Sequence, residues 1–477
     1  TQSKRVSIYT FQNINNAHNS YSGVRLARSD IIIPHQSCSM KNLIFESRSY
    51  DRKGKVCESI EYHNKHISAK AKEEKFKKMK ASPYAFYRGS NHIYWSDFAG
   101  NWQLHRFGGS AFSRTWLEGD AHVYNMGAYL NDIEVVSYGF DDYDDSLVAD
   151  YQYDVWRFAI SMVLDCQENG KLSTSDISKC VQTFSVHYLE TIATFENDDS
   201  FSSSFNKSNT GKPLMKFLSK TEKKFSRARM LNKWTVANET RQFKNIKGKL
   251  TPLDKDLELY GKLMESFKGY VDTVSEEFLS YYKGHYEVLD LAVRKSAGTG
   301  SLGLQRYYGL LRGNTDSTYD DVILDVKQQV QPTAFSYLSE EEIKEYNYNF
   351  ENHAHRHAIA YRSLSQYPDC HIGWLSIDGV CFSVRERSPF KNDFPTFKLT
   401  TIKAYSAMAK QWAEIMAKKH LKAARKLNGS LDPYVFEATL NRITHDRTKE
   451  FGVFVNQIAQ CYARQVRKDW LYFCEGF

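Results

Sequence analysis

The sequence predicts an α+β fold of two lobes, in which mostly helical segments flank a β-rich segment at residues 289–387. Before and after that segment, apolar residues recur at every third or fourth position, which is typical of amphipathic helices. Within it, short apolar runs are bounded by turn residues, which indicates strands. At 477 residues, the chain is long enough to form more than one hydrophobic core.

The first half of the chain contains two strongly periodic segments. Residues 1–80 show no clear periodicity, and we expect them to form a peripheral arm. An amphipathic helix is indicated from Val155 to Val163, and a second one at 257–278. Between them, residues 195–213 are rich in Ser, Asn, Asp and Gly, which is typical of a loop or a mobile insertion.

The second half begins with strands and ends with helices. Residues 340–366 indicate a helical piece among the strands, and the chain after Pro389 is predicted to be helical. The predicted strands lie at 289–293, 304–311, 322–326, 372–375 and 380–384.

These elements divide the chain into four parts. The β-rich part is the predicted small lobe. The parts are a peripheral arm (1–80), a large-lobe half with a helical insertion (81–288), the small lobe (289–387) and C-terminal helices that complete the large lobe (388–477).

The composition, 42% apolar and 25% charged, is that of a soluble globular protein. No run of about 18 apolar residues occurs, so we expect no membrane-spanning helix. The eight cysteines include no Cys-x-x-Cys pair, which argues against a zinc ribbon or a thioredoxin-type site. In a chain of this length they are typical of a reducing compartment, and we expect the protein to be cytoplasmic.

The net charge of +8 is modest, and basic residues gather at 65–80 and 207–249. Such clusters can mark a surface for an anionic partner. Solvent-facing helix and loop positions explain them better, because no RNA- or DNA-binding motif accompanies the charge. We therefore do not expect nucleic acid to be a partner.

Two carboxylates and an amide form the first chemical motif. It reads Gly-Asp-Ala-His-Val-Tyr-Asn at residues 119–125, and an Asp-Tyr-Asp segment follows. Asp120 is a candidate base for a hydroxyl group, and Asn125 and Asp142 are candidate metal ligands. Asp144 is a further candidate ligand. Mg²⁺ suits this set because it is a hard cation that prefers oxygen donors.

A glycine-rich loop forms the second motif. The loop, Gly-Thr-Gly-Ser-Leu-Gly at 298–303, offers Gly298, Gly300, Ser301 and Gly303 as contacts for nucleotide phosphates. A strand is predicted to follow it instead of a helix. A Rossmann-type dinucleotide site is therefore not indicated.

Lys327 ends the apolar run Val-Ile-Leu-Asp-Val-Lys and needs a charged partner if it is buried. ATP phosphates and an acidic residue of the following helical piece would supply one. The alternative is a solvent-facing lysine on an edge strand. The candidate acidic residues are Glu341, Glu342, Glu345 and Glu351.

Together the two motifs supply the base, metal ligands, phosphate loop and lysine of a protein-kinase-like phosphoryl-transfer site. In ordinary kinases the glycine loop and the lysine come first, whereas here they come last. We therefore expect a two-lobe protein-kinase-like fold in circularly permuted order, which is tolerable because chain termini often lie close together. ATP and Mg²⁺ are the expected cofactors, and Lys327 should face Asp142 across the nucleotide cleft.

Arg88 lies in an aromatic stretch ahead of the first motif. Because a guanidinium pairs with phosphate through two hydrogen bonds, Arg88 is a candidate catalytic contact for a phosphate group. The alternative is a structural ion pair, for example with Asp97. We expect His122 to be a packed support of the loop, and Asp154 to be its structural anchor.

Several stretches resemble a bacterial family, domain of unknown function 2252, which is grouped with kinase-like folds. The resemblance runs from about Ser82 to the C-terminus and implies a fold more than a reaction, because the family's activity is not established. The stretches that carry it are Ser-Pro-Tyr-Ala-Phe-Tyr-Arg-Gly at 82–89, the loop at 116–127, the acidic segment 142–145, and residues 153–157, 298–303, 326–327, 385–391, His420 and 462–465.

The chain departs from the family pattern at several positions. Asp141 stands where the family has Asn, and Lys419 and Leu421 stand where it has Ala. Gln328 replaces a Glu that would be a possible acidic partner for Lys327.

The function expected from these residues is ATP- and Mg²⁺-dependent transfer of a phosphoryl group to a hydroxyl of an unknown small molecule or protein. Glu118 stands where aminoglycoside-type phosphotransferases usually have His. With Asp141 and Gln328, it favours a second hypothesis, a nucleotide-binding pseudokinase or regulatory module. A third possibility keeps the fold but transfers another part of the nucleotide.

Overall fold

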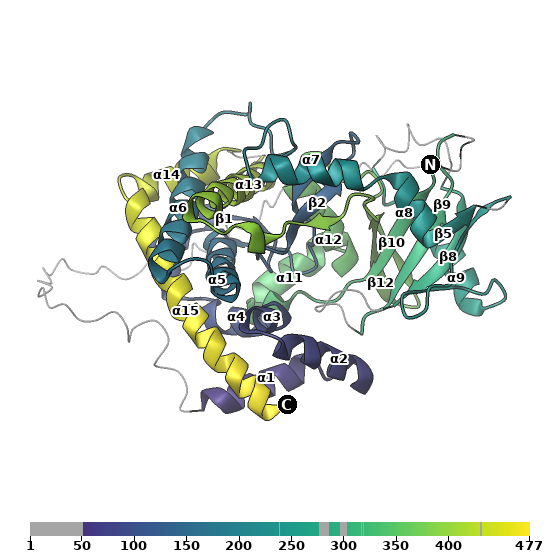
Figure 1. Cartoon of the computed structure of the whole chain (residues 1–477), viewed down its shortest axis with the longest axis horizontal. Coiled ribbons are helices and arrows are strands. Elements are labelled where there is room, and N and C mark those ends of the chain that lie inside the picture. The colour runs from purple at the N-terminus through teal and green to yellow at the C-terminus, as the bar shows by residue number, and fades with distance from the viewer. Residues whose placement is uncertain are drawn as a thin grey trace, which may run out of the picture.

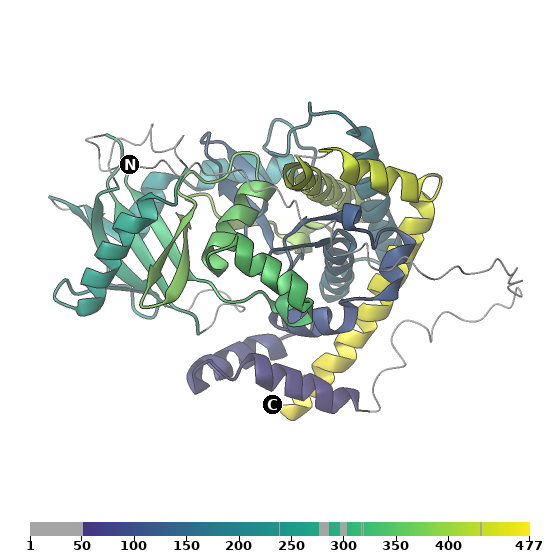
Figure 2. The same ribbon diagram turned by 180° about the vertical axis from the view of Figure 1, so that it is seen from behind.

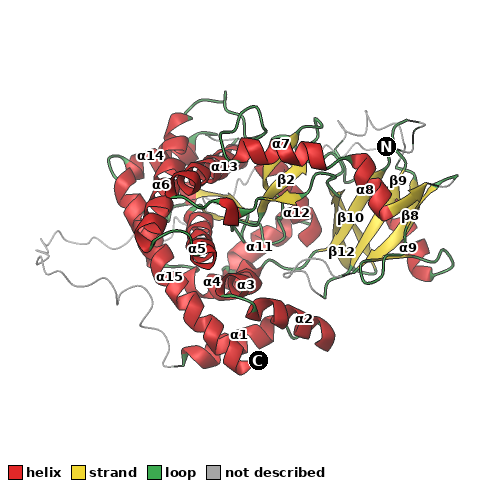
Figure 3. Cartoon of the chain, viewed as in Figure 1, coloured by secondary structure: helices red, strands yellow, loops and turns green. Residues whose placement is uncertain are grey.

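The computed structural model describes residues 51–237, 239–275, 286–295, 303–315, 317, 319–429 and 432–477. Helices account for 53% of it and strands for 16%, so the fold is α+β, as the sequence predicts. Figure 3 shows that the helices gather on one side of the molecule and most strands on the other. Among the described residues, no helix is long and apolar enough to cross a membrane.

The largest core lies between long helices, which we call the helical body. Helix α5 is buried along nearly its whole length. Trp156 of α5 and Trp412 of α13 are among the largest buried side chains of this core. Helix α6 packs on both α13 and α15, so residues from distant parts of the chain share this core. The helices of the body are α5 (Gln152–Asn169), α6 (Thr174–Thr194), α13 (Ile402–Asn428), α14 (Val435–Thr444) and α15 (Thr448–Gly476).

A six-stranded antiparallel sheet forms the second part, in the order β11-β12-β10-β9-β8-β7 (Figure 1). The side chains of Leu324 and Val326 point to one face, where they share a core with α9 (Glu258–Val271). Because side chains alternate along a strand, Asp325 and Lys327 point to the other face. The strands are β7 (Leu250–Pro252), β8 (Val288–Arg294), β9 (Arg306–Leu311), β10 (Val322–Gln328), β11 (Gly373–Ile377) and β12 (Val380–Glu386).

All five strands predicted for this part are present, with ends that differ by a few residues. The sheet also includes β7, which precedes residue 289, and α9 ends at Val271 instead of 278. The predicted helical piece at 340–366 is two helices, α11 (Glu340–Asn349) and α12 (His353–Leu364). Asn352 separates them, since its side chain accepts hydrogen bonds from the first amides of α12 and begins a new helix.

Two pairs of short strands position the chemical motifs. Strand β1 (Arg114–Leu117) pairs with β4 (Leu147–Asp150), and β2 (Met126–Leu130) pairs with β3 (Val136–Phe140). The segment 118–125 joins β1 to β2, and the segment 141–146 joins β3 to β4. Both segments of the first motif are therefore held at each end by a strand.

Residues 52–80 form helices that the sequence did not indicate. Helices α1 (Arg52–His63) and α2 (Ala69–Lys80) lie beside the end of α15 (Figure 2). Arg52 binds Asp469 of α15 and also Asp97 at 2.7 Å. The ion pair with Asp469 ties α1 to the helical body, and residues 1–50 lie outside the described residues.

The remaining elements connect these parts. Residues 195–213 contain no regular helix or strand, which confirms the predicted loop. The connecting helices are α3 (Pro83–Gly89), α4 (Asn91–Phe98), α7 (Leu214–Lys224) and α8 (Arg227–Trp234). The short strands are β5 (Thr235–Ala237), β6 (Arg241–Phe243) and β13 (Asn392–Asp393), and the 3₁₀ turns are Trp102–Arg106, Ala111–Ser113, Thr333–Tyr337 and Thr396–Lys398.

Candidate active site

Lys327 of the six-stranded sheet contacts the acidic segment between β3 and β4. Its ammonium nitrogen lies 3.5 Å from Asp142 Oδ1 and contacts Asp144 Oδ2 more closely. Lys327 is only 9% exposed, and β10 is an inner strand of the sheet, so the solvent-facing alternative is wrong. The structure thus brings together a lysine and two carboxylates from distant parts of the chain.

The predicted glutamate partners of Lys327 do not pair with it. Glu342 instead binds Arg114 at 3.1 Å, and Glu351 accepts a hydrogen bond from the Trp374 indole. The expectation that a glutamate of the helical piece pairs with Lys327 was therefore wrong, because Asp142 and Asp144 are its ion-pair partners.

The substitution at Gln328 does not remove a partner of Lys327. Successive side chains of a strand point to opposite faces, and Gln328 accepts a hydrogen bond from the Gln305 amide instead. The next residue, Gln329, returns to the lysine's face and donates to Asp144 Oδ1 at 2.8 Å.

Charge balance around Lys327 determines the protonation of its neighbours. Burial would raise the pKa of the Asp144 carboxyl, but the charge of Lys327 outweighs it and lowers that pKa. Burial lowers the pKa of Lys327, and the two aspartates reverse that effect and raise it. Both groups are therefore charged at neutral pH.

Two arginines extend the polar face of the sheet beside Lys327. Arg306 binds Asp325, with Nε 2.6 Å from Oδ1. Burial alone would raise the pKa of Asp325, but Arg306 brings it to about 2. Arg385 of β12 donates to the Asp141 carbonyl at 2.7 Å, which links the sheet to the loop that carries Asp142.

Asp120 belongs to the same region, and its two carboxylate oxygens have different neighbours. Oδ1 accepts hydrogen bonds from the Arg157 guanidinium, with Nε at 2.7 Å. Oδ2 accepts no hydrogen bond from the described residues, and the His122 ring nitrogen lies 3.9 Å from it. Burial raises the pKa of Asp120 to about 7, although Arg157 opposes this shift.

The backbone ahead of Asp120 is anchored by Asp154 of α5. Its two oxygens accept the amide hydrogens of Glu118 and Gly119, at 2.7 and 3.0 Å. The predicted role of Asp154 as a structural anchor is confirmed. His420 of α13 lies 3.3 Å from the same carboxylate and links α13 to this anchor.

Glu118 supports the loop from within. Its carboxylate accepts from the Asn125 amide nitrogen at 2.8 Å and from the Asp120 amide at 2.9 Å. Burial raises its pKa well above the usual value, and the charges of Asp120 and Asp154 add to the shift.

Asn125 uses only its amide nitrogen in these contacts. Its Oδ1 accepts no hydrogen bond from the residues that the structure describes. An oxygen of this kind is a suitable ligand for a hard cation.

Close contact between the two motif loops requires glycine at position 119. Gly119 has φ +85°, and a Cβ atom there would overlap the Asp145 carbonyl oxygen. Asp145 in turn accepts from the Thr333 amide at 2.7 Å and from Asn91 at 3.0 Å. The loops at 118–125 and 141–146 are thereby fixed against each other.

Arg88 lies at the edge of this region with its guanidinium 5.9 Å from the Tyr124 ring centre. It makes no ion pair with the described residues. The structural alternative with Asp97 is wrong, because Asp97 binds Arg52 and the Tyr462 hydroxyl instead. Burial raises the pKa of Asp120. The charge of Arg157 opposes this rise, and the charge of Arg88 opposes it to a smaller extent.

His122 supports the loop as expected. It is buried, and its Nδ1 accepts from the Tyr124 amide at 3.2 Å and faces the Tyr84 hydroxyl at 3.4 Å. Burial lowers its pKa well below the usual value, so the ring is neutral.

Of the predicted glycine loop, Gly298, Gly300 and Ser301 lie outside the described residues. Gly303 is described, with φ +95°, and a Cβ there would collide with Ile67 between α1 and α2. The end of the loop therefore lies against the N-terminal helices.

Comparison with family models gives one match, over residues 69–476, to the family described as an uncharacterized protein conserved in bacteria (DUF2252). The chain belongs to this family. The expected relationship to DUF2252 is thus confirmed over most of the chain. Neither the curated proteins nor the solved structures contain a match.

Two residues that shape this DUF2252 site were missed in the sequence. Arg157 is buried between the Tyr87 and Tyr94 rings and holds Asp120. Arg356 of α12 donates to the carbonyls of Ser146 and Asp144, at 2.5 and 2.6 Å. A charged residue within an apolar helix stripe, as in Val-Trp-Arg-Phe around 157, was the available signal.

The DUF2252 chain contains no group of three or more His, Cys, Asp or Glu side chains arranged to hold a metal, within the described ranges. Any site for a cation here would therefore rely on Asn125 and the two aspartates near Lys327, with the remaining ligands from elsewhere.

Proposed function

We propose that this protein is an ATP- and Mg²⁺-dependent phosphotransferase with a two-lobe, kinase-like fold in permuted chain order. The proposal rests on the position of Lys327, 3.5 Å from Asp142 across the boundary between sheet and helical body. Phosphoryl transfer needs a lysine for the phosphates and a nearby aspartate for the metal. If this lysine bound no ligand, an apolar residue at the same buried position would cost less free energy.

The donor groups fit Mg²⁺, which prefers a few carboxylate or amide oxygens and keeps several waters. The Oδ1 atom of Asn125 is available, and the Asp142 side chain is 40% exposed. We assign these two residues as metal ligands and Asp144 as a third or supporting group. The ion would neutralise charge on the phosphates.

Asp120 is the group that would receive the proton. The acceptor hydroxyl oxygen attacks the γ-phosphorus, the bond from phosphorus to the β–γ bridging oxygen breaks, and ADP leaves. The hydroxyl proton passes to the Asp120 carboxylate. Oδ2 is the oxygen suited to this role, because Oδ1 is held by Arg157.

The remaining basic groups would bind phosphate oxygens. Lys327 would pair with the inner phosphates once the nucleotide displaces part of its contact with the aspartates. Arg88, which pairs with no carboxylate in the described part of the chain, would contact the transferred group. The loop 298–303 would cover the phosphates.

The test is turnover of Mg²⁺-ATP with a panel of metabolites and proteins as acceptors. Asp120→Ala and Asp142→Ala should each abolish product formation, while Asp254→Asn at an exposed turn should leave it unchanged. Activity that survives both alanine substitutions would refute the assignment.

A second candidate is a nucleotide-binding pseudokinase, favoured by the occupation of both aspartates by Lys327 and by the buried Glu118 beside Asp120. ATP would then raise the melting temperature without any product over long incubation. A related enzyme would transfer the nucleotidyl group instead, and mass spectrometry of the modified acceptor separates the two transfers.

A further inference from the structure

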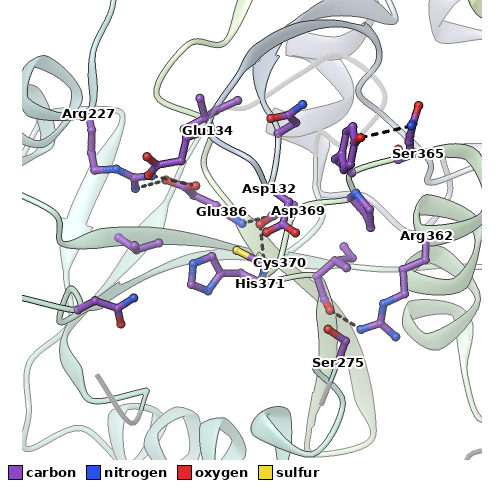
Figure 4. A pocket seen from close by; sticks show the side chains of 18 of the residues that line it. Asp132, Glu134, Arg227, Ser275, Arg362, Ser365, Asp369, Cys370, His371 and Glu386 are labelled. Carbon is purple, nitrogen blue, oxygen red and sulfur yellow. Dashed lines mark hydrogen bonds and ion pairs between the residues drawn. The ribbon is translucent and has the colours of Figure 1, made fainter. Parts of the chain in front are cut away.

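A second hollow lies away from the candidate active site. It is a cavity of about 870 Å³ between the β2–β3 turn, the segment that joins α12 to β11, and the end of α13. Figure 4 shows Asp369, Cys370 and His371 in its middle, with Arg227 and Glu386 on one side and Arg362 on the other. None of the residues assigned above to phosphoryl transfer lines it.

Strand β12 separates the two places. Arg385 points to the candidate active site, where it donates to the Asp141 carbonyl. The next residue, Glu386, points the opposite way and binds Arg227 at the cavity wall. Because side chains alternate along β12, Arg385 belongs to the candidate active site and Glu386 belongs to the cavity.

Three cations line one end of the cavity. Arg362 comes from α12, and Lys422 and Lys426 come from successive turns of α13. Their described hydrogen bonds go to backbone carbonyls: Arg362 to Thr273 and Ile372, and Lys422 to Ser365 at 2.7 Å. None of the three forms an ion pair with a carboxylate among the described residues.

The cations repel one another without compensation. Burial, and to a lesser extent the charge of Lys426, lower the pKa of Lys422 to about 8. Burial also lowers the pKa of Lys426, with a contribution from Arg362. An anion placed among the three would relieve both the repulsion and the lost hydration.

The opposite end has the reverse character. Asp369 is buried there, Glu386 is partly buried, and Arg227 is paired with Glu386. An anionic group would be repelled from that end and attracted to the cations, so the cavity fixes the direction in which a ligand lies.

We propose that this cavity binds a small molecule through a phosphate or other multivalent oxyanion group held by Arg362, Lys422 and Lys426. The site is distinct from the nucleotide site and does not depend on the proposed phosphotransferase activity. Its volume accommodates a ligand larger than inorganic phosphate, with the acidic end facing hydroxyl or amino groups of the remainder.

The experiment uses isothermal titration of the full chain with inorganic pyrophosphate, at constant ionic strength and without Mg²⁺. The wild type should bind, and Lys422→Gln with Lys426→Gln should weaken binding about tenfold or more. Lys410→Gln, an exposed lysine on the same helix, should bind as the wild type does. Lys327→Gln should also retain binding, which separates this cavity from the nucleotide site.

A single substitution at the cavity rim guards against misfolding. Lys426 is the most exposed of the three cations, although its ammonium group still loses hydration at the cavity rim. Lys426→Glu should therefore fold normally and still weaken binding. Titration with inorganic phosphate and with a sugar phosphate distinguishes the free anion from a phosphate ester as the preferred ligand. Absence of binding to all three probes overturns the proposal. Equal binding by the wild type, the Lys422→Gln/Lys426→Gln double variant and Lys426→Glu also overturns it.

Discussion

Lys327 Nζ lies 3.5 Å from Asp142 Oδ1, although the two residues belong to different parts of the fold and to distant parts of the sequence. The contact joins an inner strand of the sheet to the loop between β3 and β4. Its two partners are the groups that would bind the phosphates and the metal in our proposal. The predictions below examine this contact and the loops that support it.

Replacing Lys327 by Met should weaken ATP binding on the order of 10- to 100-fold, because a charge-assisted contact to phosphate is lost. Titration calorimetry with Mg²⁺-ATP measures the change. Lys403→Met, at an exposed position of α13, is the control and should bind ATP like the wild type. Equal affinity in both variants would remove Lys327 from the nucleotide site.

Asp120 should make stability depend on pH. Its pKa in the folded protein is raised to about 7, mainly by burial, above the ordinary value of 3.8. The folded state therefore binds the proton more tightly, so this contribution to stability is complete below about pH 4 and is lost as the pH rises to about 7.

Urea unfolding between pH 4 and pH 8 measures this dependence. The free energy of unfolding of Asp120→Asn should lack the part of the pH slope that Asp120 supplies, whatever its absolute stability. Identical slopes in variant and wild type would show that the Asp120 pKa is not raised.

Removal of the Asp154 carboxylate should destabilise the loop at 118–125. Asp154→Ala leaves the buried amides of Glu118 and Gly119 without their acceptor, which costs about 2–4 kcal/mol. Chemical denaturation measures the loss, with Asp176→Ala in the exposed first turn of α6 as the control. A loss no larger than in the control would argue against the anchor.

Gly119→Ala should destabilise the protein more than Gly170→Ala. Both glycines have positive φ, so each alanine costs about 1–2 kcal/mol in backbone strain. Only the new Cβ at position 119 meets a neighbour, the Asp145 carbonyl, whereas nothing lies within 4 Å at position 170. Thermal melting of the two variants gives the comparison, and equal melting temperatures would show that the motif loops are not in contact.

Arg88→Ala should reduce activity while changing the free energy of unfolding by less than about 1 kcal/mol. Its guanidinium contacts only the Tyr124 ring at long range, and such contacts contribute little. Kinetic assay and denaturation of the same preparation test both parts. A large loss of stability would assign Arg88 a structural role.

The local elements of this fold were predictable from the sequence, whereas most long-range contacts were not. The apolar run that ends at Lys327 indicates a strand whatever surrounds it. That Lys327 faces Asp142 was expected from the two motifs together, and the structure brings them within 3.5 Å. The direct ion pairs were not expected, because the acidic partner of Lys327 was predicted among glutamates of the next helical piece. The sequence did not indicate helix α1, because only Val56 and Ile60 are buried along it and they form too short an apolar stripe.

Buried arginines and the second cavity illustrate the same limit. Arg157 is held by Asp120 and by the Tyr87 ring, and these contacts form only when α3 and α5 pack together. Arg362 and Lys422 read as ordinary surface charges in the sequence. Their convergence depends on how α12 and α13 approach each other.

The most direct test of the central claim is a crystal structure with Mg²⁺ and a non-hydrolysable ATP analogue. Our account predicts phosphates beside Lys327, with the ion coordinated by Asn125 and Asp142 and the γ-phosphate directed toward Asp120. An analogue bound elsewhere, for example in the cavity beside Arg362 and Lys422 with the Lys327–Asp142 contact undisturbed, would contradict it.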